Sequence, residues 1–227
     1  MSSPSQSIVI AVDGTAASGK GTLAKRLARH FGFAHLDSGA LYRLTALAVL
    51  EAKGDPKNET DALKGAQTID FNRAGDPAIR TDIVGKAASE VAAIPAVRQA
   101  LLDFQQDFLA RPPGGSPGAV MDGRDIGSVI APDATAKLYV DARPEIRAHR
   151  RWQELQAMGI VRDEGDLLRE LVGRDLADKT RAVSPLIQAP GASLLDTSDL
   201  GIDAAFAAAL TLVSPKVEGA LKDRHRG

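Results

Sequence analysis

The sequence predicts an α/β fold with a parallel sheet, because two features recur along the chain. First, short apolar segments of strand type alternate with segments of helical periodicity. These segments are 7–12, 33–36, 118–121, 136–140 and 193–195. Second, an aspartate directly follows every one of them: Asp13, Asp37, Asp122, Asp141 and Asp196. Ligands of open parallel sheets bind outside the carboxyl ends of the strands, so we expect these carboxylates around one crevice. For Asp141 and Asp196, a role as a strand end or helix cap is an equal alternative.

Helices are expected between the strands. One covers 20–31 and ends at Gly32, and a second covers 39–52. The chain then turns polar and rich in Gly and Pro before a helical stretch over 83–109, which Pro95 divides. A segment dense in charged residues, 147–181, follows later in the chain. These shifts predict a core of residues 1–52, 111–146 and 182–227, an insertion of residues 53–110, and the charge-dense segment 147–181.

Composition narrows the classes of protein. With 227 residues, 44% hydrophobic and 4% aromatic, the chain can bury a sizeable core made mainly of Ala, Leu, Ile and Val. A net charge of −1 gives no electrostatic reason to expect a nucleic acid or a membrane surface as the main partner. There is no cysteine, and the four histidines lack metal-ligand spacing, so any metal must be held by oxygen atoms. No leader or run of about 18 apolar residues is evident, and we expect a cytoplasmic monomer without a membrane span.

A glycine-rich loop follows the first strand and precedes a helix, which is the context of a phosphate-binding loop. Its residues are Gly14, Thr15, Ala16, Ala17, Ser18, Gly19, Lys20, Gly21 and Thr22. The glycines let backbone N–H groups point at a phosphate, the helix N-terminus adds partial positive charge, and Lys20 adds a full one. Gly21 stands where the strict pattern has Ser or Thr, so Thr22 is a less secure ligand for Mg²⁺. A glycine-rich turn that binds nothing is the alternative, and the flanking elements disfavour it.

Two further loops carry candidate residues. The segment after the second strand runs from Asp37 to Arg43; Ser38 has the helix N-cap as its alternative role, whereas Arg43 needs an anion in an otherwise apolar helix. After the third strand, Asp122 could hold Mg²⁺ through water, with Arg124 and Asp125 beside it. The alternative there is a tight turn with a surface ion pair.

Basic residues are concentrated in the charge-dense segment 147–181 and just before it. They are Arg143, Arg147, Arg150, Arg151, Arg162, Arg169, Arg174, Lys179 and Arg181. Spacing places Arg147, Arg150 and Arg151 on one helix face. A solvated charged face suits Arg143, Arg162 and Arg169, whereas we expect phosphate contacts from Arg150, Arg174 and Arg181.

Six segments, in order and across nearly the whole chain, resemble the bacterial cytidylate kinase family. They are GTAASGKGT, LDSGALYR, AASEVAAIPAVRQALL, MDGRDIGSVIAPDA, RAHRRWQEL and RDLADKTRAVSPL. The resemblance is specific, because DSGALYR and DGRDIG together are not general features of phosphate loops. It implies a three-layer P-loop fold of five parallel strands, with residues 53–110 as a shortened monophosphate-binding region and residues 147–181 as a lid. It also implies a transferase that moves the γ-phosphoryl group of ATP, with Mg²⁺, to CMP or dCMP in pyrimidine metabolism.

Site residues follow from the same resemblance. It implies that Ser38, Arg43 and Arg124 hold the acceptor phosphate, and that Ser89, Arg98 and Asp125 read the cytosine edge. Arg174, Asp178 and Arg181 would reach the sugar and the phosphates, and residues 14–22 with Arg150 would bind ATP. The catalytic charges would be Lys20, Arg124, Arg174 and Arg181. Between Asp61 and Arg80 the chain is shorter than the usual bacterial form of this family, which predicts that the small antiparallel sheet of that region is reduced or missing.

Two alternatives stay open at this point. Another small kinase, for UMP, AMP or a non-nucleotide metabolite, would share the ATP loop and differ at the acceptor. A GTP-dependent switch protein would need a guanine-reading Asn-Lys-x-Asp segment, and the sequence has none.

Overall fold

The sheet has five strands in the order β2-β3-β1-β4-β5, in a computed structural model that describes residues 7–224. The strands are β1 Ile8–Gly14, β2 Ala34–Asp37, β3 Gly118–Gly123, β4 Ala136–Asp141 and β5 Ser193–Asp196. Strand β1 pairs in parallel with β3 and with β4, and β4 pairs in parallel with β5. The predicted α/β class with a five-stranded parallel sheet is confirmed.

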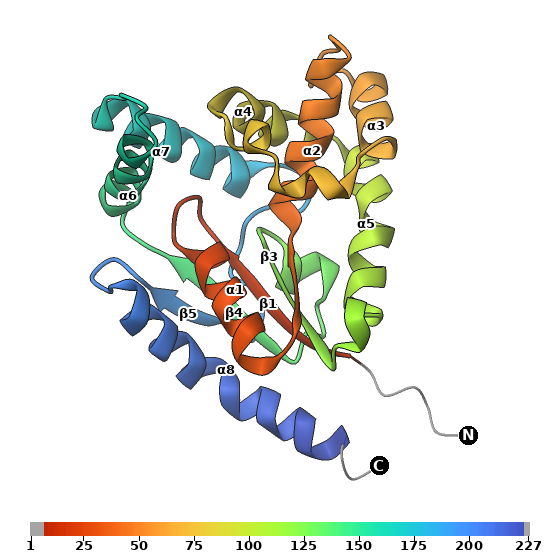
Figure 1. Cartoon of the computed structure of the whole chain (residues 1–227), viewed down its shortest axis with the longest axis vertical. Coiled ribbons are helices and arrows are strands. Elements are labelled where there is room, and N and C mark those ends of the chain that lie inside the picture. Colours follow the sequence, from red (N-terminus) through yellow and green to blue (C-terminus); the bar gives the residue numbers. More distant parts are fainter. Residues whose placement is uncertain (1–6, 225–227) are drawn as a thin grey trace. The chain divides into compact units, whose positions relative to one another are not determined.

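Eight α-helices connect and flank the strands within the described residues (Figure 1). They are α1 Lys20–Phe31, α2 Ser38–Glu51, α3 Glu59–Gln67, α4 Asp82–Val91, α5 Pro95–Ala110, α6 Pro144–Ala157, α7 Glu164–Thr180 and α8 Ile202–Arg224. Short turns of 3-10 type lie at η1 Phe71–Gly75, η2 Pro77–Arg80 and η3 Pro113–Gly115, and a single π turn forms η4 Ile126–Ile130. Pro95 begins α5, as its fixed φ and missing N–H favour.

The chain forms two compact units. Residues 7–36 and 109–224 make the first, with the sheet, α1, α6, α7 and α8, and residues 37–108 make the second. Helix α2 packs against α3 and α4, so it belongs to the second unit, although the division drawn from composition groups residues 38–52 with the core.

One face of the sheet is covered by α1 and α8 (Figure 1). Alternate residues of β1 and β4, such as Val12 and Leu138, point into this core and are buried against Leu27 of α1 and Val213 of α8. Burying such a side chain contributes about 1.5–3 kcal/mol. Helix α1 ends at Gly32, whose left-handed φ of 67° closes the turn as predicted.

By length and composition alone, helix α8 is long and apolar enough to cross a membrane. The sequence pattern predicts no uninterrupted apolar run of that length. Four of its residues at helical spacing, Ala205, Ala209, Val213 and Val217, are buried in the core with β1 and β4. These residues form the face of α8 that packs in the core.

The segment between α3 and α4 contains η1 and η2 and no strand, which agrees with the expected loss of a small sheet there. Arg73 holds this segment, because its guanidinium binds both carboxylate oxygens of Glu51 at 2.9 and 2.8 Å and also binds Asp76. Backbone turns of 3-10 type and one exposed ion-pair network therefore replace strand pairing.

Candidate functional site

A loop of residues 15–19 connects β1 to α1 at the carboxyl end of the sheet. Gly14 lies against the backbone of β4, where a β-carbon would be 1.9 Å from the carbonyl oxygen of Val140. Ala17 and Gly19 have left-handed φ values of 58° and 87°. Such residues turn successive backbone N–H groups toward one point, which makes a concavity for an anion.

Polar contacts hold this loop in place. The buried Thr15 hydroxyl donates to Asp141 Oδ1 at 2.6 Å, and the buried Ser18 hydroxyl donates to the Thr15 carbonyl at 3.0 Å. Lys20 Nζ lies 3.2 Å from the same carbonyl oxygen. The first turn of α1 has no acidic residue, so its partial positive charge is available to a phosphate.

Asp122 lies beside the start of α1. Its Oδ2 is 3.4 Å from the position of a β-carbon on Gly21, and its Oδ1 is 2.8 Å from His35 Nε2 on β2. Thr22 is exposed. The glycine that replaces the usual hydroxyl residue thus lies close to this carboxylate, and the sequence pattern did not predict the contact with the histidine.

One carboxylate at this point fits a hydrated Mg²⁺ that arrives with nucleotide phosphates, since Mg²⁺ often keeps several waters and takes one or two carboxylates. Among residues 7–224, no group of three or more metal-ligating side chains is present. These side chains do not suit a metal held by several direct protein ligands. They do suit a Mg²⁺ ion that Asp122 contacts through water.

A buried ion pair joins the loop after β3 to α7. Arg124 Nε lies 2.8 Å from Asp178 Oδ2, and the two side chains are only 16% and 10% exposed. Burial opposes both charges, yet Asp178 raises the pKa of Arg124, and Arg124, Arg174 and Arg181 together hold the pKa of Asp178 below its usual value. The alternative of a surface ion pair at this loop is wrong.

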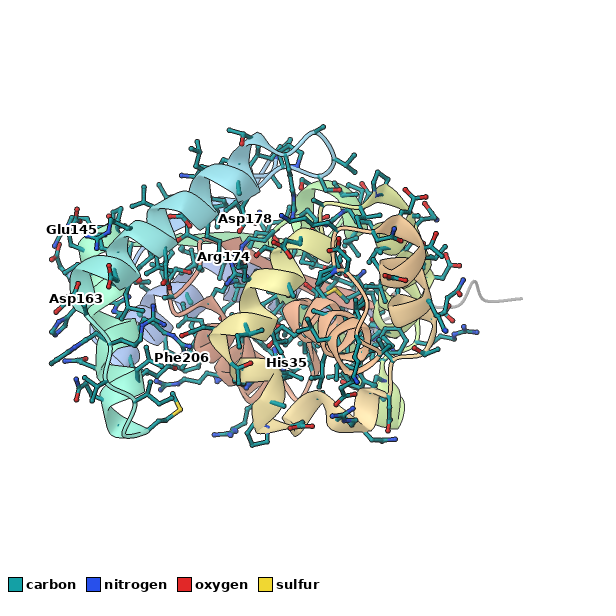
Figure 2. The ribbon with its side chains drawn as sticks, turned by 90° about the horizontal axis from the view of Figure 1, so that it is seen from above. His35, Glu145, Asp163, Arg174, Asp178 and Phe206 are labelled. Atoms are coloured by element: carbon teal, nitrogen blue, oxygen red, sulfur yellow. The ribbon has the colours of Figure 1, made fainter. Side chains whose placement is uncertain are left out.

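Helix α7 and the segment after it bring further charges to the same loop. Figure 2 shows Arg174 and Asp178 on α7. Arg181 follows the helix, and its Nη2 lies 3.9 Å from Oδ1 of the buried Asp125. The structure therefore brings Arg124, Asp125, Asp178 and Arg181 together within the first unit.

Asp13 has a role that the strand-end pattern did not reveal. Its two carboxylate oxygens accept hydrogen bonds from the backbone N–H groups of Ile126 at 2.8 Å and Gly127 at 2.7 Å. These residues begin the π turn that follows Asp125. Burial raises the pKa of Asp13 to about 6, although the two backbone hydrogen bonds oppose this shift.

The three arginines of α6 contact different partners, although helical spacing predicted that they share one face. Arg150 donates to Thr197 Oγ1 at 3.0 Å, to the Thr197 carbonyl at 2.6 Å and to the Leu200 carbonyl at 3.3 Å. Arg151 pairs with Glu154. Arg147 is 2% exposed, so a solvated face does not describe it.

The remaining predicted residues belong to the second unit. Asp37 caps α2 by accepting from the Ala40 N–H at 3.3 Å, so the N-cap alternative for Ser38 is wrong. Arg43 Nη1 donates to the Ile79 carbonyl at 3.0 Å.

Arg43 also lies beside α4, since a β-carbon on Gly85 would be 3.3 Å from its Nη1. Ser89, one turn further along α4, donates to the Gly85 carbonyl at 3.3 Å. The buried Arg98 donates to the Ala92 carbonyl at 3.1 Å and lies 5.4 Å from the ring centre of Tyr42. Arg43 and Ser89 thus lie on neighbouring helices.

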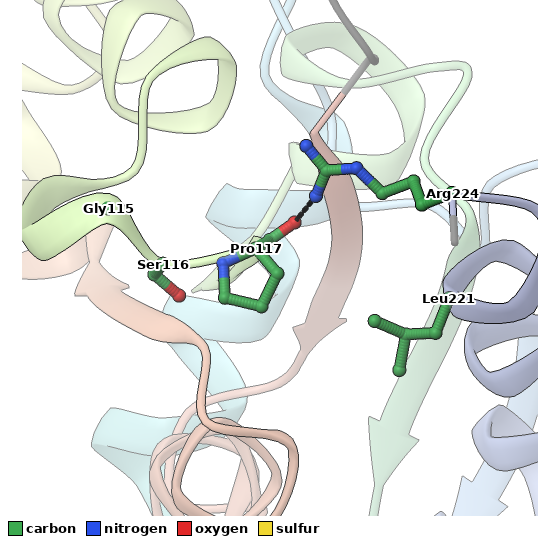
Figure 3. A pocket seen from close by; sticks show the side chains of 5 residues that line it. All are labelled: Gly115, Ser116, Pro117, Leu221 and Arg224. Atoms are coloured by element: carbon green, nitrogen blue, oxygen red, sulfur yellow. Dashed lines mark hydrogen bonds between the residues drawn. The ribbon is translucent and has the colours of Figure 1, made fainter. Parts of the chain in front are cut away.

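A pocket of about 290 Å³ lies elsewhere, between residues 115–117 and the end of α8 (Figure 3). Arg224 closes one side by donating to the Pro117 carbonyl. Pro117 directly precedes β3, so this pocket is at the amino ends of the parallel strands. Ligands of such sheets bind at the opposite edge, and we assign it no role.

A phosphate loop at the carboxyl edge of a parallel sheet, with arginines of α7 and of the loop after β3 nearby, defines a P-loop kinase. A family model described as Cytidylate kinase matches residues 10–214. The chain belongs to the cytidylate kinase family.

Curated relatives agree. The chain is 53% identical to a cytidylate kinase of Rhodopseudomonas palustris strain TIE-1, over 91% of this chain and 95% of that protein. It is 50% identical to a cytidylate kinase of Rhodospirillum rubrum, over 92% of this chain and 98% of that protein. A solved structure of an uncharacterised protein from Eubacterium ventriosum shares the fold, with a TM-score of 0.51 at 13% identity over 91% of this chain and 98% of that one.

Proposed function

We propose that this protein transfers the γ-phosphoryl group of ATP to CMP and dCMP, giving CDP and dCDP in pyrimidine nucleotide metabolism. The observation that carries the proposal is the 53% identity to a cytidylate kinase over 91% of this chain. The order of the motifs, with the phosphate loop first and DGRDIG after β3, supports it.

ATP binds at residues 14–22 in this proposal. The backbone N–H groups of the loop and the N-terminus of α1 hold its phosphates, and Lys20 adds a full charge. The hydrogen bonds of Thr15 and Ser18 support the assignment, because they fix the loop before a ligand arrives. Arg150 contributes from α6, beside the loop that follows β5.

CMP is the acceptor. Ser38, Arg43 and Arg124 hold its phosphate, and Arg174, Asp178 and Arg181 reach its sugar and phosphate. These assignments come from the family resemblance. The lowered pKa of Asp178 supports them, since Arg124, Arg174 and Arg181 all lie close enough to favour its ionised form, and arginines gathered at one place suit a phosphate.

Ser89, Arg98 and Asp125 read the base. Cytosine offers an amino donor where uracil offers a carbonyl acceptor, so a carboxylate favours cytosine. Asp125 is buried, so a contact between its carboxylate and the cytosine amino group would be shielded from water.

Phosphoryl transfer needs the two anionic nucleotides in line, against their mutual repulsion. Lys20, Arg124, Arg174 and Arg181 offset that repulsion and stabilise charge in the transition state. When bound through Asp122 and water, Mg²⁺ supplies further charge neutralisation on the phosphate oxygens. The acceptor phosphate already carries anionic oxygens, so no general base is required.

The organisation of the chain serves this reaction. Residues 53–110 form the monophosphate-binding region, and residues 147–181 form a lid that excludes water and limits ATP hydrolysis. We also propose that the enzyme is a cytoplasmic monomer that acts on small nucleotides; its net charge of −1 gives no electrostatic reason to expect a nucleic acid or a membrane surface as its main partner.

The test is an ADP-release assay with ATP, Mg²⁺ and one of four acceptors: CMP, dCMP, UMP or AMP. We expect CMP and dCMP to have the highest kcat/KM. If UMP or AMP is the better acceptor, the base-reading roles of Ser89, Arg98 and Asp125 are wrong, while the ATP site is unaffected.

A further inference from the structure

Arg147 is a buried arginine at the start of α6. Its side chain is 2% exposed, although arginine is among the residues least often buried unless paired. Nε donates to the Ala142 carbonyl at 2.7 Å and Nη1 to the Ala16 carbonyl at 3.1 Å. Nη2 lies 2.6 Å from Asp175 Oδ2. One planar group thus contacts three separate parts of the chain.

Each of these three parts lies in or next to an element that the proposed reaction uses. Ala16 lies in the phosphate loop, Ala142 follows β4, and Asp175 is on α7. Asp141, whose Oδ1 holds the Thr15 hydroxyl, also lies 4.0 Å from Arg147 Nε. The phosphate loop is therefore attached at two successive residues to one cluster of charges.

Asp175 forms its ion pair with this arginine, and Arg124 is also close enough to interact with it electrostatically. Asp175 is buried, and its second oxygen, Oδ1, has no hydrogen-bond partner among residues 7–224. A buried carboxylate is stable only with a partner, so the contact with Arg147 fixes where this turn of α7 lies.

The same turn of α7 carries residues of the proposed mechanism. Arg174 is adjacent to Asp175, and Asp178 lies three residues further, on the same face. Asp178 pairs with Arg124 of the loop after β3. Helix α7 is thus attached at Asp175, through Arg147, to the phosphate loop, and at Asp178 to the loop after β3.

We propose that Arg147 and Asp175 are positioning residues that set the place of α7 relative to the phosphate loop, so that Arg174 and Arg181 meet the transferring phosphoryl group. The inference rests on the proposed function. It assigns a role to two residues that act through others, since neither is placed in contact with a nucleotide. An exposed ion pair would do this poorly, because solvent-exposed pairs contribute little and hold no fixed geometry.

The test variant is Asp175→Asn, which keeps the size of the side chain and leaves the two bonds of Arg147 to backbone carbonyls intact. The matched control is Asp166→Asn on the same helix, where the carboxylate is exposed and pairs with Arg169. Both are studied as full-length protein, with thermal unfolding checked first.

We expect kcat with CMP to fall about tenfold to a hundredfold in Asp175→Asn, as small misplacements of reacting groups do. The Kd of a non-hydrolysable ATP analogue, measured by calorimetry, should change less than about threefold, because the loop itself is intact. In the wild type, binding of this analogue should slow hydrogen exchange of the α7 amides, and this slowing should be lost in Asp175→Asn. Asp166→Asn should behave as the wild type in all three measurements.

Unchanged kcat in Asp175→Asn would overturn the inference, and so would an analogue that still protects the α7 amides of that variant. If Asp175→Asn does not fold, Arg147→Lys repeats the test, because it keeps the charge while losing the three-way contact. The exchange measurement needs no CMP, so a wild-type protein inactive on CMP would refute the proposed function and leave this inference decidable.

Discussion

The carboxylate of Asp13 holds the loop after β3 through the backbone of Ile126 and Gly127. This loop carries Arg124 and Asp125, so an acid at the end of the first strand places residues more than one hundred positions later in the chain. Its ionisation state decides how strongly it accepts those two hydrogen bonds, because an ionised carboxylate is the stronger acceptor.

Asp13 should titrate with a pKa of about 6, since its burial outweighs the two backbone hydrogen bonds. The folded state then binds a proton more tightly than the unfolded state, and the contribution of Asp13 to stability falls as pH rises from about 4 through about 6. Asp178 acts in the opposite sense, because its lowered pKa makes its contribution fall as pH drops below the usual value for aspartate.

The measurement is the carboxyl carbon shift of Asp13 followed by NMR from pH 3 to pH 8. A midpoint near 6 agrees with the structure, and a midpoint near the ordinary value of 3.8 would contradict it. An Asp13→Asn variant identifies the resonance by its disappearance.

At the level of strands and helices, β1 approaches β4 closely at Gly14, where the phosphate loop begins. A β-carbon there would meet the Val140 carbonyl oxygen at 1.9 Å, and φ is 154°. We expect Gly14→Ala to destabilise the fold by several kcal/mol, because both backbone strain and a clash with main chain must be relieved. Gly191→Ala is the control: its φ is 75°, with no atom within 4 Å of the β-carbon, so only the conformational cost of about 1 kcal/mol applies.

Urea unfolding of both variants measures this difference. If Gly14→Ala loses no more free energy of unfolding than Gly191→Ala, the close approach of β1 to β4 is wrong.

Strands and helices are predictable here because their signals are local. The five apolar segments match β1 to β5 to within two residues at each end, and Gly32 ends α1 as its left-handed φ requires.

The roles of Asp13 and Arg147 depend on partners distant in the chain, such as Ile126 and Asp175. Helical spacing placed Arg147 on a face with Arg150, but no local pattern says which arginine will be buried. The cap at Asp37 rather than Ser38 is a shift of one residue, within the usual uncertainty of helix ends.

For the protein as a whole, a net charge of −1 does not exclude a local cluster of arginines. Within the first unit, Arg124, Arg174 and Arg181 all lower the pKa of the single carboxylate Asp178. We propose that these arginines, together with Lys20 and the backbone N–H groups of the phosphate loop, let two mutually repelling nucleotides react in one site.

The most direct test of this claim is the single-turnover rate of phosphoryl transfer from ATP to CMP in Lys20→Ala and Arg181→Ala. Arg169→Ala serves as the control, because Arg169 is an exposed partner of Asp166. We expect a loss of about a hundredfold or more in each of the two variants and a near-normal rate in the control. Near-normal transfer in both Lys20→Ala and Arg181→Ala would contradict this claim.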